Sequence, residues 1–456
     1  MKKNLTTKES IALSSMLFGM FFGAGNLIFP AALGPAAGAN LWSAYAGLFI
    51  TAVGLPMLAV AALGKSRTTG IVKLSDKVSH RYALFFSALL YLTIGPLFAI
   101  PRCASTSFAV GAVNLLGDAD EKKATVIFSF LFFAVVLYVA LRPGKVMTTI
   151  GKILNPAFLV FLAVLVVAAL LNPVERIADV APAAGYATPG KAFFSGFLEG
   201  YNTLDALAGL AFGIVVVYIV RKNGVEDPDR IAVNTIRSGI FSCLGMGVIY
   251  LAITVVAAQS SSICEGLTNG GEMLGRIAGY HFGGIGSWLM AAIVTLACLK
   301  TAVGLVISCG EAFVEMFPKG PRYLWWATIF CVVSFGIANF GLTSIVSYCV
   351  PVLMFIYPMA ITIILLALFS KRFGDAHSVW VWTTVFTVAA AVFDFVRTLS
   401  STLQGSGVTN TAVLDAIGSF GSKVLPFSDL GLGWVCPAIV GFIIGLIISR
   451  KEKKAA

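Results

Sequence analysis

The chain has 456 residues, of which 58% are hydrophobic and only 12% charged, and its formal net charge is +11. A soluble domain carries about 25% charged residues, so this composition excludes an ordinary soluble protein. A chain of this length can hold about a dozen apolar segments of roughly 20 residues with short loops. We therefore expect one integral membrane domain, residues 1–456, rather than several soluble domains.

Hydropathy predicts an all-α integral membrane protein with twelve transmembrane helices. In chain order, the predicted spans cover residues 10–37, 41–63, 82–113, 123–141, 146–171, 192–220, 231–258, 283–316, 323–338, 341–369, 377–397 and 431–449. The first span follows Lys2 and Lys3 and so resembles a secretory signal. Because eleven more apolar segments follow, we interpret it as a retained span.

The distribution of basic residues predicts the orientation in the membrane. An even number of spans puts both termini on one side, and 23 of the 32 Lys and Arg residues fall in the segments on that side, against seven on the other. Cytoplasmic loops retain Lys and Arg, so both termini are predicted to be cytoplasmic. The net positive charge then faces anionic lipid and requires no nucleic-acid partner.

The first span is interrupted by a glycine-rich stretch, Phe22-Gly23-Ala24-Gly25-Asn26. A second interruption, Glu199-Gly200-Tyr201-Asn202-Thr203-Leu204-Asp205, lies in the sixth span. A broken helix survives in lipid only where protein, ligand or trapped water satisfies the freed backbone groups. Matching breaks in two halves of a chain are typical of a transporter whose substrate site lies between them.

The spacing of the two breaks predicts an inverted repeat of five plus five spans. Asn26 and Asn202 are 176 residues apart, and five spans are an odd number, so the second half begins on the opposite side of the membrane. Repeat one is predicted to cover residues 9–171 and repeat two residues 190–370. Spans eleven and twelve, within residues 375–450, are predicted to be accessory.

The backbone groups freed by a broken helix suit a zwitterion. Small residues let a carboxylate approach the N–H groups of the half-helix that begins near Asn26, while free carbonyls around Gly19 to Phe22 and Phe197 to Gly200 can hold an ammonium or a cation. Nearby apolar side chains would receive a hydrophobic side chain. The candidate substrate-binding residues at or beside the breaks are Gly23, Ala24, Gly25, Asn26, Tyr91, Ile94, Phe98, Phe197, Gly200, Tyr201 and Asn202.

Two basic residues, Arg102 and Lys300, lie within predicted spans, and such groups suggest function. Arg102 and Glu199 lie at matching depth, so we predict an ion pair that either closes the outer path or statically orients span six. Asp205 would ligate a cation or a substrate amine, or cap its half-helix. Pro96 and Pro101 are expected to bend span three. Residues 259–280 fit an outer lid or a simple loop.

Four motifs carry a resemblance to a known family: FGAGNLIFPAALG from Phe22, GPLFAIPR from Gly95, FLEGYNTLDALAGL from Phe197 and LKTAVGL from Leu299. In these motifs, and over essentially its whole length, the chain closely resembles the branched-chain amino acid transport system II carriers. The resemblance implies a LeuT-type fold with broken spans one and six. It also implies cation-coupled import of leucine, isoleucine and valine across a bacterial inner membrane, with the lipid bilayer as surroundings and no obligate protein partner.

The same resemblance implies a cation site between spans one and eight. Gly25 and Asn26 match the glycine–asparagine pair that serves the substrate carboxylate and a nearby ion in sodium-coupled members. The second ion site would have backbone ligands at Gly19, Phe22 and Ala297 and hydroxyl ligands at positions 300 and 301.

The chain departs from the sodium pattern because position 300 is Lys300, while Thr301 keeps its hydroxyl. Either sodium binds at Gly19, Phe22, Ala297 and Thr301, or the Lys300 ammonium replaces it and the carrier couples to protons. Alternatively Lys300 snorkels along its helix or pairs permanently with Glu199 or Asp205. The coupling ion, sodium or proton, is the only cofactor expected.

Other function classes find little support in the residues. A membrane-embedded enzyme needs a nucleophile, base or metal set, but the chain has neither HExxH nor GxSxG, so no catalytic residues are predicted. A channel, an exchanger or an amino-acid sensor on the same fold remains an alternative to coupled uptake.

Overall fold

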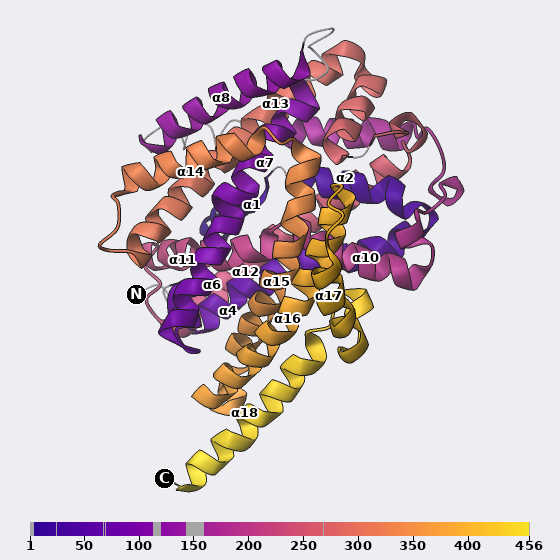
Figure 1. Ribbon diagram of the computed structural model, residues 1–456. Coiled ribbons are helices and arrows are strands. Elements are labelled where there is room, and N and C mark those ends of the chain that lie inside the picture. Colours follow the sequence, from indigo (N-terminus) through magenta and orange to yellow (C-terminus); the bar gives the residue numbers. More distant parts are fainter. Residues whose placement is uncertain are drawn as a thin grey trace.

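The computed structural model describes residues 4–23, 25–66, 68, 70–112, 120–142, 159–267 and 269–455, and within these ranges every regular element is helical (Figure 1). By length and composition, seven helical stretches can each cross a membrane, and the shorter apolar helices Leu159–Leu171 and Tyr323–Ala338 accompany them. The all-α fold class is therefore confirmed. The full number of twelve membrane crossings stays a prediction.

The two predicted breaks are confirmed. The first span consists of α1 (Thr7–Phe21) and α2 (Gly25–Ala37), and the sixth of α10 (Pro189–Asn202) and α11 (Asp205–Lys222). In both places two short helices replace one long helix, and the described residues between them are not helical. Figure 1 shows all four within the helical bundle.

The other predicted spans fall on single helices or on helices joined through π-helical turns. Span two comprises α3 (Leu41–Phe49), η2 (Ile50–Gly54) and α4 (Leu55–Ser66). Span three comprises α6 (His80–Leu92), η3 (Thr93–Leu97), α7 (Ala99–Ser107) and η4 (Phe108–Ala112). The later elements are α8 (Glu121–Ala140), α12 (Pro228–Ala258), α13 (Gly270–Met316), α14 (Tyr323–Ala338), α15 (Leu342–Phe369), α16 (His377–Gly405), α17 (Ala412–Val424) and α18 (Val435–Ala455). Within span five, residues 146–158 lie outside the described ranges.

Span three bends where proline was expected to bend it. In η3 the backbone of Gly95 is not helical, with φ −102° and ψ −123°, and Pro96 follows it. Proline cannot donate to the preceding turn, so a helix kinks at such a residue. The bend separates α6 from α7, and α7 then packs against α13 and α2 beside the two breaks.

Small residues bring the second broken span close to span two. A Cβ on Gly196 of α10 would meet the carbonyl of Ala44, and one on Gly47 of α3 would meet the carbonyl of Phe193. The hydroxyl of Thr51 donates to the carbonyl of Phe197 at 2.8 Å. Only glycine allows this backbone contact, which fixes where α10 ends relative to the rest of the bundle.

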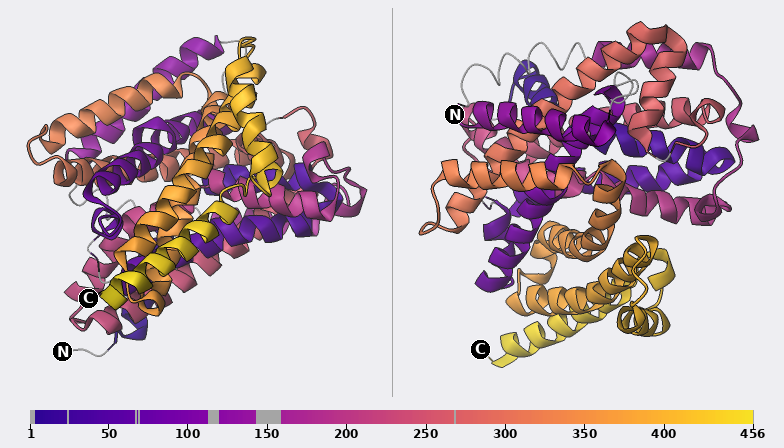
Figure 2. Two further views of the ribbon diagram at one scale, coloured as in Figure 1. Left: turned by 60° about the horizontal axis from the view of Figure 1, so that its bottom comes forward. Right: turned by 45° about the horizontal axis from the view of Figure 1, so that its top comes forward.

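The C-terminal helices lie on one flank of the bundle. Figures 1 and 2 show α16 in orange and α18 in yellow side by side, and contacts between these two helices and between α15 and α16 join them to the rest. That spans eleven and twelve are accessory stays a prediction. The exact bounds of the two repeats stay predictions.

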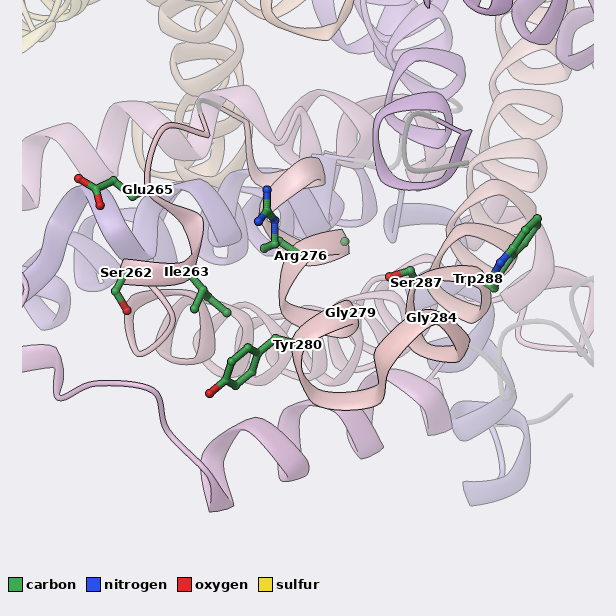
Figure 3. Close-up of a pocket in the computed structure, with 10 residues that line it drawn as sticks. Ser262, Ile263, Glu265, Arg276, Gly279, Tyr280, Gly284, Ser287 and Trp288 are labelled. Atoms are coloured by element: carbon green, nitrogen blue, oxygen red, sulfur yellow. The ribbon is translucent and has the colours of Figure 1, made fainter. Parts of the chain in front are cut away.

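Residues 259–280, the proposed lid, contain η8 (Ser262–Cys264) and the first turns of α13. The long helix α13 is interrupted at Gly283, which has φ 61° and ψ −155°. A Cβ on Gly270 would meet the carbonyl of Ile28 in α2, so the segment covers that half-helix closely. A surface cavity of about 620 Å³ lies here. Figure 3 shows its lining residues, which include Glu265 and Arg276, and none of the described candidate residues is among them.

Candidate functional site

The two breaks are joined by a buried polar cluster of three side chains from three helices. Asp205, at the start of α11, accepts hydrogen bonds from the Asn26 amide of α2 at 2.9 and 3.0 Å. The hydroxyl of Tyr250 in α12 donates to the same carboxylate at 2.6 Å and also contacts the Asn26 amide. None of the three side chains is more than 2% exposed.

Asn26 also closes its own break. Its side-chain oxygen accepts from the Gly23 N–H at 2.7 Å, while its backbone N–H donates to the Gly23 carbonyl at 3.2 Å. The side-chain amide therefore caps the first break with its oxygen and holds Asp205 with its nitrogen. Such a network is costly to leave half satisfied in a low-dielectric interior, so the two breaks are held in one fixed relation.

The second break depends on a strained residue. Leu204, directly before α11, has φ 64° and ψ 9° although it is not glycine, and it is only 3% exposed. The left-handed conformation costs a non-glycine residue about 1–2 kcal/mol. The hydroxyl of Thr203 donates to the Gly200 carbonyl at 2.9 Å and takes up part of the freed backbone. Strain of this kind is typical of functional sites.

Arg102 lies between the breaks, but its partner is not the one expected. The guanidinium donates from Nη1 to the carbonyl of Asn202 at 2.7 Å and lies 5.0 Å from the ring centre of Phe29. Glu199 instead accepts from the Asn202 side chain at 3.2 Å. The predicted ion pair between Arg102 and Glu199 is therefore absent from the described contacts. The carbonyl freed where α10 ends is an unused acceptor, and it takes the guanidinium.

A small cavity of about 40 Å³ lies among these groups. Its polar lining includes Arg102, Asp205, Asn26 and Thr301, and its apolar lining Met20, Phe21, Ile94, Ala99, Phe212 and Leu305. Because one water needs about 10–15 Å³ by this measure, the space holds a few waters at most. An amino acid would enter only if the lining moved apart.

The cavity brings together one part of the predicted substrate residues. Gly23, Gly25, Asn26 and Ile94 line it directly, and Asn202 contributes its carbonyl through Arg102. Ala24 lies outside the described residues.

Other predicted substrate residues lie elsewhere. Tyr91 lines a separate cavity of about 130 Å³ beside Glu311 and Glu315. Tyr201 stacks on Tyr357 with ring centres 4.0 Å apart, and Gly200 packs against Thr51. Phe197 contributes its carbonyl to a bond with Thr51, and Phe98, although buried, is not among the lining residues. None of these five positions is among the residues that line the central cavity.

Part of the candidate cation site also comes together. The Thr301 hydroxyl lies 3.1 Å from the Ala297 carbonyl and 3.5 Å from the Phe22 carbonyl at the end of α1. Oxygen ligands of this kind suit a hard cation. Gly19 lies near the C-terminal end of α1, and Lys300 is half-buried on α13 next to Thr301. Three of the four proposed sodium ligands are thus neighbours.

Sequence reasoning missed Tyr250, the third member of the polar cluster. It lies inside a long apolar helix of 31 residues, where a tyrosine has no local feature that distinguishes it from a packing residue. Its role becomes visible only when α12 is packed against α2, which places its hydroxyl on Asp205.

Comparison with protein families gives one match over nearly the whole chain. Residues 6–452 match the model of a family described as "Branched-chain amino acid transport protein". The branched-chain amino acid permease BrnQ of Lactobacillus delbrueckii subsp. lactis is 48% identical over 457 residues, covering 100% of both chains. The permease BraB of Bacillus subtilis is 38% identical, covering 98% of this chain and 97% of its own.

Solved structures give the fold. The nucleobase-cation-symport-1 family transporter Mhp1, in a closed conformation with bromovinylhydantoin bound, aligns with a TM-score of 0.60 at 15% identity, over 98% of this chain and 93% of that one. MhsT in complex with L-phenylalanine aligns with a TM-score of 0.55 at 15% identity, over 99% of both chains. At such identity the likeness concerns the fold alone, and it supports the LeuT-type architecture.

Proposed function

This chain belongs to the branched-chain amino acid transport protein family, and we propose that it is a cation-coupled symporter that imports leucine, isoleucine and valine by alternating access. Its LeuT-like fold and its permease relatives support transport rather than catalysis. We further propose that it works in the bacterial inner membrane with both termini cytoplasmic, on the strength of the 23 to seven asymmetry of basic residues.

One observation carries the substrate proposal. Arg102 and Asp205, 4% and 1% exposed, line the same cavity, and no direct ion pair joins them among the described contacts. Two opposite charges buried in a low-dielectric interior normally pair with each other. A buried pair of opposite charges that lines one cavity without a direct ion pair is complementary to a ligand that carries both charges, which is the property of an amino acid zwitterion.

The apolar part of the cavity supports a branched aliphatic side chain. Ile94, Phe212 and Leu305 come from three different helical elements and approach the same space. Burial of a leucine or valine side chain among such groups contributes about 1.5–3 kcal/mol. A polar or charged side chain would lose its hydration there without compensation, so the three branched-chain amino acids are favoured together.

For the coupling ion we propose that the Lys300 ammonium occupies the place that sodium takes in related carriers. The neighbouring oxygens of Phe22, Ala297 and Thr301 support a cation at this place. Lys300 lies in the same turn of α13 as Ala297 and Thr301. A lysine in a partly desolvated site can carry and release a proton. The competing proposal is a sodium ion held by Gly19, Phe22, Ala297 and Thr301.

Asp205 has two proposed roles, and the structure favours the structural one. Asp205 is the first residue of α11, where a negative charge interacts favourably with the helix dipole. It also accepts bonds from Asn26 and Tyr250. We propose that it holds the two half-helices together and presents negative charge to the substrate ammonium, without being the primary cation site.

Uptake of labelled leucine into proteoliposomes tests the function. We expect leucine to accumulate inside above its external concentration when an inward proton gradient is imposed. Equilibration down the leucine gradient alone would indicate a channel, and uptake that requires internal amino acid would indicate an exchanger. Leucine binding without any flux would indicate a sensor. Replacement of sodium by choline at two pH values tests the ion. Little loss of uptake is expected, and strict dependence on sodium would refute the Lys300 proposal.

A substitution sharpens the ion test. Lys300→Ser restores the small hydroxyl residue expected in sodium-coupled relatives, so uptake by this variant should become sodium-dependent. Adding Thr301→Val to the Lys300→Ser variant removes the Thr301 hydroxyl while the side-chain volume stays nearly the same. This second substitution should abolish the new dependence on sodium. If Lys300→Ser transports leucine as the wild type does in choline, the lysine is not at the cation site.

A further inference from the structure

We propose that Arg102 is the residue that binds the substrate carboxylate, and that it does so by exchanging the Asn202 carbonyl for the ligand. This inference deepens the proposed transport of amino acids and depends on it. It gives Arg102 a role in substrate selection. This role replaces the ion pair with Glu199, which was predicted to close the outer path because the two residues have the same predicted depth in the membrane.

The first support is the unused hydrogen-bonding capacity of the guanidinium. Arginine has five N–H donors and no acceptor, and the described residues accept a hydrogen bond from one of these nitrogens, Nη1, at the Asn202 carbonyl. Nε is buried without a hydrogen-bond partner in the described part of the chain, and the whole residue is only 4% exposed. A charged donor left unpaired in the interior is costly, so this place lacks an anion.

The second support is the position of the guanidinium at the start of α2. A Cβ added to Gly25 would lie 2.5 Å from Nη2 and 3.1 Å from Cζ of Arg102. The first turn of this helix carries N–H groups without intrahelical partners and the positive end of its dipole. A guanidinium and a helix N-terminus repel each other unless an anion lies between or beside them. Both therefore call for the same negative group.

Among the described residues, no carboxylate forms an ion pair with Arg102. Asp205 is held by Asn26 and Tyr250 and forms no ion pair with Arg102 among the described contacts. Glu199 accepts from the Asn202 side chain. The missing anion must come from outside the chain. The cavity opens onto Arg102, Gly25 and several apolar side chains, so an anion attached to an aliphatic group fits best.

Binding then becomes an exchange of partners. The substrate carboxylate accepts two parallel hydrogen bonds from the guanidinium, a geometry that arginine favours, and also faces the N–H groups of α2. The Phe29 ring, 5.0 Å from the guanidinium, keeps the cation beside the helix start during the exchange. The Asn202 carbonyl is released and accepts a hydrogen bond from the substrate ammonium, close to the negative charge of Asp205.

The exchange makes a prediction about ligand chemistry. Arg102 should recognise an α-carboxylate and should contribute nothing to the binding of the same molecule as an amide. The probes are leucine and leucinamide, whose apolar side chain and amine are the same. Their dissociation constants can be measured by calorimetry on the purified full-length protein and on its Arg102→Gln variant.

We expect Arg102→Gln to weaken leucine binding about 10- to 100-fold, the loss that follows removal of a charged hydrogen-bond partner, and to leave leucinamide binding within about twofold. The preference for leucine over leucinamide should therefore collapse. An equal loss for both ligands, or an unchanged affinity for leucine, would overturn the inference. Arg102→Lys keeps the charge but lacks the planar fork, and should restore only part of the preference.

A second variant serves if Arg102→Gln does not fold. Gly25→Ala leaves the charge in place but pushes the guanidinium from the start of α2, so it should weaken leucine binding more than leucinamide binding. Gly304→Ala is the matched control, because a Cβ there meets no atom within 4 Å, and both affinities should be unchanged. If Gly25→Ala weakens both ligands equally, the carboxylate is bound elsewhere.

The same experiments separate this inference from the function on which it rests. A wild-type protein that neither binds nor transports leucine would remove the proposed function itself. A wild-type protein that transports leucine, with an Arg102→Gln variant that loses both ligands alike, would leave the function standing and refute only the role of Arg102.

Discussion

Replacement of Tyr250 by phenylalanine isolates one bond of the cluster that joins the two breaks. The side chain is fully buried, and its hydroxyl donates to the Asp205 carboxylate at 2.6 Å. Tyr250→Phe keeps the ring and removes this donor. A hydrogen bond to a charged group contributes about 1.5–3 kcal/mol, whereas bonds inside membrane proteins average about 0.6 kcal/mol. Because the acceptor is a buried carboxylate, we expect a loss of at least about 1.5 kcal/mol.

Tyr357 provides a matched control. It is also fully buried, and its hydroxyl has no hydrogen-bond partner among the described residues. Tyr357→Phe removes a polar group that gains nothing in the fold, so it should be neutral or stabilising by up to about 1 kcal/mol. The free energies of unfolding can be compared by denaturant titration in mixed micelles with circular dichroism. Equal effects of the two substitutions would refute the claim that the cluster holds the breaks together.

Two further predictions concern packing and pH. Gly200→Ala should destabilise the protein by about 1–3 kcal/mol because the new methyl group meets Thr51. Gly190→Ala on the same helix is the control, because a methyl group there meets no atom within 4 Å and should leave the stability unchanged. Thermal unfolding in detergent measures both effects. Hydrogen bonds, first of all from Ser400, hold the pKa of Asp415 below its usual value. Its stabilisation of α17 is therefore present at neutral pH and lost as pH falls through the lowered value. Hydrogen exchange in α17 should be slower in the wild type than in Asp415→Asn at neutral pH, and the difference should shrink at low pH. Equal exchange at neutral pH, or a difference that does not change with pH, would contradict this prediction.

The breaks were predictable because glycine and polar residues interrupt otherwise apolar segments at these places. Gly23, Gly25 and Asn202 stand out in this way, and the structure ends or starts a helix beside each. The contact of Asn26 with Asp205, 179 residues away, was not predictable, because hydropathy gives the depth of a residue and not its neighbours. Tyr250 was missed for the same reason.

The direction in which a residue faces was also beyond the sequence. Tyr91 and Ile94 are one turn apart in span three, yet only Ile94 lines the central cavity. Ile94 lies within the wider turn of η3, which begins at Thr93, whereas Tyr91 lies in the regular helix α6. Each such irregularity rotates the residues that follow relative to a regular helix. A span that is apolar all round gives no pattern from which that rotation could be inferred.

Arg102 shows where matching depth misleads. The sequence predicts the same depth for Arg102 and Glu199, but the acceptor found is the backbone carbonyl of Asn202, which is free because α10 ends there. A break creates acceptors that no side-chain pattern records. The sequence therefore indicated that Arg102 needs a partner at this depth, and the structure was needed to identify it.

Competition against labelled leucine uptake tests the central claim most directly, which is that the charges at the two breaks together bind a zwitterion. The competitors are valine, 4-methylpentanoate, which lacks the ammonium, and 3-methylbutylamine, which lacks the carboxylate. Only valine should inhibit uptake by the wild-type protein, because each of the other two leaves Asp205 or Arg102 without its counter-charge. Inhibition by either single-charge analogue as strong as that by valine would contradict the account.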